Sequence, residues 1–571
     1  MIHSQERRLK RWAEHFEEQF SWPKATANRP ELPACEPWTI SLEAPSLMEI
    51  ETAIKALKRF KAAGPDKLSP SLFKEGGPLL VAQLWNIFKT VWESETVPSE
   101  WSQSTIIPVY KKGNRTSCEN HRGISLITIA SKLLAGIILH RLTAFRESQI
   151  SESQAGFRPG RGCVDHLFTI RQLMEQRHTY RRPTIIIFLD LKAAFDSVDR
   201  QFLWYYLESC GMPGKYVNLL KSLYCGSRAS VRTYGESTEE FFTNSGVRQG
   251  CPASPFIFNF VIEALLHLAS PNNMEQGIEL LPGNRLTSLE YADDIVLLGE
   301  NPISMQGFLN KLVHSAKSLG MHFAPAKCKM LLQDWVDPPP ILSLDGTVLE
   351  RVDRFVYLGS CITPDGHVDE EISIRIRKAR QAFANLSHLW RRRDIRLTTK
   401  GRVYAAAVRP VLLYASETWP LRLEDKRRLE VFDNRCLRSI SRIWWEHRVS
   451  SEEVRRRVFG ARHRKNKILD IVRRNQLRWL GHVLRMKEAR LPRRAMFSEP
   501  NEGWRRPSEG QAQTWQSSMK KATTALSHVG RCRLPGWSAR DKSHQWLQTL
   551  SDMAGNRDQW RSCIHELQYT L

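Results

Sequence analysis

The stretch Glu290-Tyr291-Ala292-Asp293-Asp294-Ile295-Val296-Leu297-Leu298 places two adjacent carboxylates between two apolar runs. The apolar residues on either side favour two short β-strands. Asp is common in tight turns, so the pattern predicts a β-hairpin with Asp293 and Asp294 at its turn. Neighbouring carboxylates repel each other unless a cation lies between them, and Mg²⁺ prefers such oxygen ligands. A polar hairpin tip without a metal is an equally reasonable interpretation of this stretch alone.

A two-metal site needs a further carboxylate from elsewhere in the chain. Asp190 is the candidate, because it follows the run Thr184-Ile185-Ile186-Ile187-Phe188-Leu189, which is typical of a buried central strand. Ligands in α/β sites are commonly placed where strands end. A helix-capping role fits Asp190 less well, because Asp196 and Asp199 lie nearer to the helix that follows.

The composition indicates a polyanionic partner. The chain has 571 residues, of which 42% are hydrophobic, and 84 Lys and Arg against 60 Asp and Glu give a formal net charge of +24. Nucleic acid is the first candidate partner and an anionic membrane surface the second.

The cysteines and the N-terminus indicate an intracellular protein. Eleven cysteines without Cys-x-x-Cys pairs argue against a disulfide framework or a zinc ribbon. The N-terminus is polar, which predicts no secretory signal, and no apolar run approaches the ~20 residues of a membrane helix. We therefore expect no membrane partner.

Several loops are suited to phosphate. Lys111 and Lys112 follow a predicted strand at 105–110, and a glycine-rich basic loop spans 154–162. A solvated surface loop is the commoner case for such a short Lys pair. The glycines of the second loop permit a close approach to the backbone of a partner. Residues 245–255 form a predicted turn that opens a helix, and a loop entering a helix N-terminus is a ready anion site.

Taken together, these motifs resemble the reverse transcriptase of non-LTR (LINE-type) retrotransposons over about residues 46–490. Residues 188–196 match the first catalytic motif of that family, and Gly246 through Pro255 match the second. Tyr291 to Asp294 match the third motif, and Tyr357-Leu358-Gly359 match the start of the primer-gripping region.

The resemblance implies a role for each matched residue. Asp190, Asp293 and Asp294 would be the catalytic triad that holds two Mg²⁺ ions. Seven residues are implied to contact the incoming dNTP or to form the turn that positions it: Phe195, Arg122, Lys111, Gln249, Arg248, Gly250 and Lys327. Those implied to contact nucleic acid are Tyr357, Leu358, Gly359, Arg158 and Arg161. For Phe195, packing in the core is the alternative to screening the sugar 2′-position.

The fold implied by the resemblance is α+β: a right-hand polymerase of fingers, palm and thumb, with an antiparallel palm sheet and a basic helical C-terminal extension. The expected divisions are an N-terminal helix and Pro-rich connector (1–45), fingers (46–182), palm interleaved with fingers elements (183–345), thumb (346–420), basic helical extension (421–490) and a Trp/Ser-rich tail of unknown role (491–571).

The function implied is RNA-directed DNA polymerisation in target-primed reverse transcription, with template RNA, a DNA primer or target, and dNTPs as partners. Such synthesis would take place in the nucleus and RNA assembly in the cytoplasm. Residues 11–16 resemble the connector that follows an endonuclease in such elements, so we expect that domain to be lacking, and an endonuclease acting in trans remains open. Two alternatives are a domesticated or group-II-intron-like reverse transcriptase and a catalytically silent relic that only binds RNA.

Overall fold

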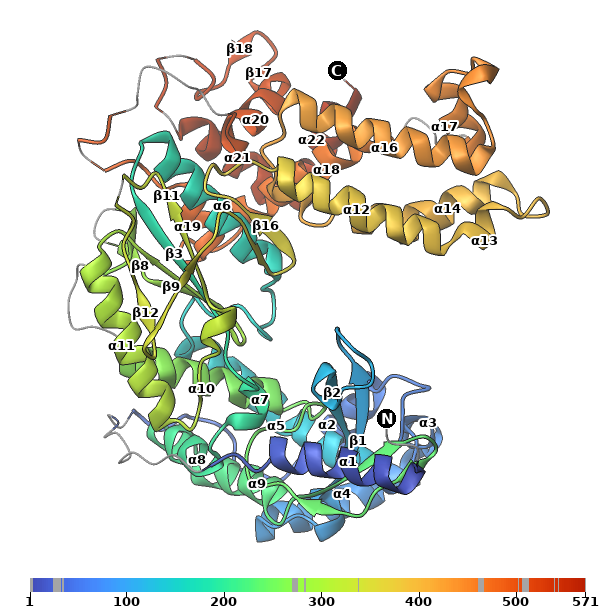
Figure 1. The fold of residues 1–571 in the computed structure, drawn as a ribbon, viewed down its shortest axis with the longest axis vertical. Helices are drawn as coiled ribbons and strands as arrows, with labels where there is room; N and C mark the ends of the chain where they lie inside the picture. The colour runs from blue at the N-terminus through green and yellow to red at the C-terminus, as the bar shows by residue number, and fades with distance from the viewer. Residues whose placement is uncertain are drawn as a thin grey trace.

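The computed structural model describes residues 4–569, apart from 24–31, 33–34, 270–275, 282–283, 337, 461–466, 502, 506–512, 539 and 543. Much of the expected Pro-rich connector therefore lies outside the described residues. The chain forms a mixed α and β structure with a C-shaped outline (Figure 1), in which an N-terminal lobe and a helical arm are joined by a central sheet.

The N-terminal lobe is built around a sheet of order β2-β1-β4-β5, with β6 also paired to β4. Strands β1 and β2 are antiparallel, whereas β1 and β4 are parallel. The elements of this lobe are α1 (Gln5–Gln19), α2 (Leu47–Ala56), α3 (Pro70–Glu75), α4 (Gly77–Ser94), β1 (Gln103–Tyr110), β2 (His121–Leu126), α5 (Ile129–Gln149), α9 (Gly214–Tyr224), β4 (Arg228–Thr233), β5 (Glu236–Ser237) and β6 (Phe241–Phe242).

The central sheet has the order β14-β11-β3-β10-β9, and its pairs are antiparallel except for β11 with β14. Its strands are β3 (Thr184–Leu189), β9 (Ser288–Tyr291), β10 (Asp294–Gly299), β11 (Lys329–Gln333) and β14 (Glu350–Arg351). Around it lie α6 (Cys163–Thr179), α7 (Ala194–Ser197), α8 (Arg200–Ser209), α10 (Ser254–Ala269), α11 (Pro302–Ser318) and the small strands β7 (Ile278–Leu281), β8 (Asn284–Leu286), β12 (Ser343–Leu344), β13 (Thr347–Val348), β15 (Phe355–Tyr357) and β16 (Ser360–Ile362).

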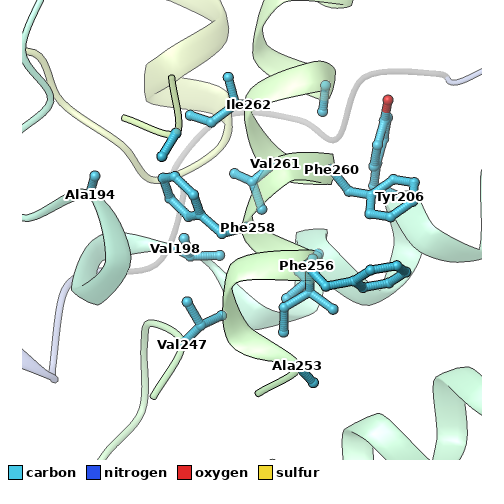
Figure 2. Packing of buried hydrophobic residues seen from close by; sticks show 14 of the residues in the cluster. Ala194, Val198, Tyr206, Val247, Ala253, Phe256, Phe258, Phe260, Val261 and Ile262 are labelled. Atoms are coloured by element: carbon cyan, nitrogen blue, oxygen red, sulfur yellow. The ribbon is translucent and has the colours of Figure 1, made fainter. Parts of the chain in front are cut away.

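Strand β3 is buried on both faces, as its unbroken apolar sequence predicts. Because side chains alternate along a strand, Ile185 and Ile187 join the core of α8, α10 and α11. Ile186 and Phe188 point the other way and pack with residues of α6. Figure 2 shows the first of these cores, where phenylalanines of α10 pack beside Ala194, Val198 and Val247. This double burial fixes the strand whose end carries Asp190.

The helical arm and the C-terminal region follow the sheet. The arm comprises α12 (Asp369–Asn385), α13 (Ser387–Trp390), α14 (Leu397–Ala407), α15 (Arg409–Leu412), α16 (Leu423–Ser441) and α17 (Ser451–Phe459). The C-terminal region comprises α18 (Ile468–Leu484), α19 (Leu491–Met496), α20 (Trp515–Ala522), β17 (His528–Val529), β18 (Cys532–Arg533), α21 (Gln545–Gly555) and α22 (Arg557–Tyr569). None of the helices in the described part of the chain combines the length and apolarity needed to cross a membrane.

A glycine in α18 lets the last helix pack closely. Trp560 of α22 is buried and donates a hydrogen bond from Nε1 to the Leu477 carbonyl oxygen at 3.0 Å. A Cβ added to Gly481 would lie 2.0 Å from that Nε1 atom. The two helices can therefore approach this closely only without a side chain at position 481.

We expect Gly481→Ala to destabilise the protein by about 1–3 kcal/mol, because the added methyl overpacks a filled core. Gly136→Ala in α5 is the matched control: its Cβ would meet no atom within 4 Å, and Ala favours a helix over Gly. Thermal unfolding of the two variants should show a lower midpoint for the first and an unchanged or higher midpoint for the second. Equal midpoints would contradict the packing argument.

Candidate active site

The hairpin predicted for residues 290–298 is present in the structure. Strands β9 and β10 pair in antiparallel register with Tyr291 opposite Asp294. The two-residue turn is thus Ala292-Asp293, and Asp294 is the first residue of β10 rather than part of the turn. Ala292 takes a φ of 58°, a left-handed conformation that is uncommon for a residue with a side chain.

The glycine-rich loop before α6 supports this turn. The Gln154 side-chain oxygen accepts hydrogen bonds from the backbone N–H groups of Ala292 (3.0 Å) and Gly156 (2.8 Å). A Cβ on Gly156 would lie 2.3 Å from the Ala292 nitrogen. The sequence suggested that these glycines allow a close backbone approach, and the structure shows that the turn of the hairpin is the neighbour. The role of Gln154 had no sequence signal beyond its place in the loop.

Asp190, Asp293 and Asp294 come together at the ends of β3 and β10. Strand pairing sets Leu189 opposite Ile295, so Asp190 follows β3 beside the start of β10. Desolvation, followed by the charges of Asp293 and Asp190, raises the pKa of Asp294 to about 6. The pKa of Asp293 is raised by desolvation and by Asp190, while Arg122 and Lys111 act in the opposite direction. Three carboxylates therefore share one site and repel each other.

Three cations line the same site. Lys111 follows β1, Arg122 lies on β2, and Lys327 ends a short 3₁₀ turn after α11. The pKa of Lys111 is lowered by desolvation and by the charges of Arg122 and Lys327, and raised by Asp190. Lys327 Nζ lies 2.7 Å from Asp190 Oδ2, and the two side chains are 59% and 38% exposed. The ammonium group thus pairs with one of the three carboxylates, that of Asp190.

The donor set suits a hard divalent ion. The three aspartates offer only oxygen atoms, and the ammonium of Lys327 already acts as a stand-in cation on one of them. The described residues bring three potential metal ligands within 4.8 Å of one another at Asp365, His367 and Asp369. That second group is next to Arg422, whose guanidinium lies 3.7 Å from Asp369, so one of its two carboxylates already faces an internal cation.

Phe195 is half-buried beside this site. Its ring stacks on Phe258 of α10 at a centroid distance of 4.2 Å, and Phe157 meets it edge-on at 6.0 Å. One face of Phe195 is therefore part of the core, which was the alternative raised from the sequence. The partial exposure leaves the rest of the ring available to a ligand.

The turn at 245–255 holds Gln249 and Arg248 in different ways. Gln249 Nε2 donates to Asp196 Oδ1 at 3.3 Å. The backbone carbonyl oxygen of Gln249 accepts from the Ser125 N–H of β2. Gly250 lies against the same residue: a Cβ there would be 2.3 Å from the Ser125 oxygen. Arg248 points inward, where its guanidinium donates to the Trp101 and Ser102 carbonyl oxygens.

The two arginines of the glycine-rich loop are paired within the protein. Arg158 is buried and contacts Glu147, and it also donates to the Ser151 and Gln154 carbonyl oxygens. Arg161 binds Glu147 and Glu152, and its side chain is 12% exposed. In this structure their charges support the loop, and neither guanidinium is free for a phosphate.

The segment Tyr357-Leu358-Gly359 forms a tight turn between β15 and β16. Leu358 and Gly359 both have positive φ, as a two-residue hairpin turn often requires. Tyr357 is buried, and its hydroxyl lies 3.1 Å from His166 Nδ1 of α6. The Leu358 carbonyl oxygen accepts from the Tyr414 hydroxyl at 2.8 Å, which ties the turn to the base of the helical arm.

Comparison with protein families identifies this part of the chain. Residues 109–362 match the family model described as reverse transcriptase (RNA-dependent DNA polymerase). These residues are a reverse transcriptase domain. The match contains the three aspartates and the cations around them, so the resemblance found from the motifs is confirmed.

Known relatives of the reverse transcriptase domain come from mobile elements. A probable RNA-directed DNA polymerase from transposon BS of Drosophila melanogaster is 25% identical over 413 residues, which are 69% of this chain and 44% of that protein. The RNA-directed DNA polymerase from mobile element jockey of Drosophila funebris is 24% identical over 463 residues, covering 77% of this chain and 49% of the relative. The Pol polyprotein from the type-2 retrotransposable element R2DM is 28% identical over 53% of this chain and 29% of its own length. The chain thus spans less than half the length of these relatives.

Burial of Asp294, together with the charges of Asp293 and Asp190, predicts how pH affects the metal-free protein. The pKa of Asp294 is higher in the folded state than in the unfolded chain, so the folded state retains a proton from about pH 4 to pH 6. Stability should therefore fall as the pH rises through this window. At pH 7, without divalent ions, the double variant Asp293→Asn, Asp294→Asn should unfold a few degrees above the wild type.

Mg²⁺ should reduce that difference by stabilising the wild type. At ten times its dissociation constant, an ion that binds only the folded state stabilises it by about 1.4 kcal/mol. Thermal unfolding in EDTA and in MgCl₂ would test this, with the variant expected not to respond. A wild-type midpoint that Mg²⁺ leaves unchanged would argue against a metal site at these residues.

Proposed function

We propose that this chain is an RNA-directed DNA polymerase that extends a DNA primer 3′-hydroxyl on an RNA template. The observation that carries the proposal is the meeting of three aspartates with Lys111, Arg122 and Lys327 at the end of the central sheet. Adjacent acidic and basic groups suit a reaction between a hydroxyl and a triphosphate that arrives with divalent ions.

The C-shaped arrangement supports a right-hand division of the chain. Residues 46–182, with β4 to β6, would be the fingers, and 183–345 the palm with its largely antiparallel sheet. Residues 346–420 would begin the thumb, and the basic helices of 421–490 would extend it along a duplex held by its phosphates. Among the described residues of 491–571, helices α21 and α22 pack against α18 of this extension.

In the active complex, Asp190, Asp293 and Asp294 would hold two Mg²⁺ ions. When bound there, Mg²⁺ supplies Lewis-acid activation of the primer hydroxyl and charge neutralisation on the pyrophosphate that leaves. Positioning and electrostatics are the protein's part of such a phosphoryl transfer.

The cations and polar groups would bind the nucleotide. Lys111 and Arg122 face the site from the N-terminal lobe and would grip the triphosphate. Lys327 would leave its ion pair with Asp190 and bind the phosphates instead. It would then donate a proton to the leaving pyrophosphate. The exposed part of the Phe195 ring would exclude a 2′-hydroxyl, and Gln249 would position the base pair.

Arg158, Arg161 and Arg248 would act indirectly, since their internal partners fix the two loops rather than contact a ligand. Tyr357, Leu358 and Gly359 would form the turn that supports the primer terminus. In the setting of target-primed synthesis, the primer would be nuclear DNA, and an endonuclease acting in trans would supply its 3′-end.

Primer extension on an RNA template with Mg²⁺ is the decisive experiment. The double variant Asp293→Asn, Asp294→Asn should lose at least about 10³-fold in rate, because several kcal/mol of charge stabilisation depends on these carboxylates. RNA binding by the variant, measured in parallel, should be retained. An inactive wild type that still binds RNA would support the silent relic and overturn the polymerase proposal.

We further expect Arg122→Ala to raise the KM for dNTPs by about tenfold or more, because a charged hydrogen bond to phosphate is lost. Lys55→Ala is the matched control, since Lys55 is an exposed cation of the same lobe on α2, and its ammonium lies 3.2 Å from Glu51 of the same helix. Steady-state kinetics with varied dNTP should separate the two. A KM shared by both variants and the wild type would remove Arg122 from the nucleotide site.

A further inference from the structure

The N-terminal helix lies outside the reverse transcriptase match, yet it reaches the candidate nucleotide pocket. Trp12, Phe16 and Phe20 are buried in a cluster with apolar residues of β1, β4 and β6. This packing anchors α1 on the sheet of the N-terminal lobe (Figure 1). The end of the helix then presents Gln19 to the segment that follows β3.

Gln19 shares a buried carboxylate with Gln249. Its Nε2 donates to Asp196 Oδ2 at 2.5 Å, while Gln249 Nε2 donates to Asp196 Oδ1 at 3.3 Å. Asp196 is 2% exposed, so water cannot readily replace either amide. Each oxygen of the carboxylate is thus satisfied by a different glutamine.

The backbone around these three side chains is fixed as well. The Phe20 carbonyl oxygen accepts from the N–H groups of Asn244 and Ser245, at 2.9 and 3.0 Å. Ser245 Oγ accepts from the Trp22 N–H and donates to the Asp196 carbonyl oxygen. The end of α1 therefore contacts both the residue after Phe195 and the turn that carries Gln249.

The ring and the amide proposed to touch the nucleotide both depend on Asp196. Phe195 precedes it directly, and the Phe195 carbonyl oxygen accepts from the Val247 N–H at 2.7 Å. Gln249 is held through its backbone by β2 and through its side chain by Asp196. A displacement of the Asp196 carboxylate would therefore also displace the Gln249 amide that donates to it.

We propose that Gln19 is a positioning residue of the nucleotide pocket, which orients Gln249 and Phe195 through the carboxylate of Asp196. This inference rests on the proposed polymerase function. It makes the N-terminal segment part of the active site, although that segment precedes residue 109, where the family match begins.

Steady-state primer extension by the full chain tests the role of Gln19. Gln19→Ala should raise the KM for dNTPs about tenfold while changing kcat by less than about threefold, because the amide orients the binding site and takes no part in the chemistry. Glu17→Ala is the matched control, since Glu17 is an exposed residue of the same helix. It should leave both constants unchanged.

Exchanging the amide and the carboxylate between positions 19 and 196 distinguishes positioning of Gln249 from general support of the fold. Gln19→Glu places a second carboxylate against Asp196 and should raise the KM further than Gln19→Ala does. Adding Asp196→Asn to that variant restores a carboxylate–amide pair with the partners exchanged. We expect the double variant to recover most of the lost dNTP affinity.

The outcomes separate the two proposals. An inactive wild type would overturn the polymerase function and this inference with it. An active Gln19→Ala variant with an unchanged KM would overturn this inference alone. A Gln19→Ala variant with a lower unfolding midpoint and equal losses in all constants, without recovery in the double variant, would also overturn it, because it would show a purely structural role.

Discussion

Electrostatic repulsion among Asp190, Asp293 and Asp294 is the constraint that the rest of the site must withstand. Like charges at the ends of adjacent strands would separate if the backbone could move. It cannot move far, because β3 is buried on both faces and the hairpin turn is held by Gln154 and closed against Gly156. The packing of the sheet thus holds three mutually repelling carboxylates together, with Lys327 paired to Asp190.

The basic residues fall into two groups, those that face the candidate active site and those that are buried in internal ion pairs. Some cations face the site and repel one another, as Lys111 and Arg122 do. Others are buried and neutralised, such as Arg158 on Glu147 and Arg409 on Asp433. A buried guanidinium needs a partner that compensates its desolvation, so these residues act as internal supports. Net charge alone therefore overstates the surface available for nucleic acid.

The sequence allowed the main features of the fold to be predicted where local pattern and burial agree. The apolar run at 184–189 is β3 with the same bounds, and the hairpin forms at the expected place. The match of residues 109–362 confirms the resemblance drawn from the motifs. The inward direction of Arg248 had no sequence signal, because an arginine in a glycine-containing turn has the same pattern whether it meets a phosphate or a carbonyl oxygen. The contact of Gln19 with Asp196 joins residues 177 positions apart and depends on tertiary packing alone.

The segments outside the reverse transcriptase match complete its core. Leu491 and Ala495 of α19 belong to the same buried cluster as Ile186 and Phe188 of β3. Phe168 of α6 meets Trp515 of α20 edge-on at 4.8 Å, so the tryptophan-rich tail covers the helix that backs the sheet. Residues 109–362 by themselves would expose this apolar face to water, at a cost of about 25 cal/mol for each Å² uncovered. The rigidity that holds the three carboxylates together therefore depends on the C-terminal region, to which the sequence alone assigned no role.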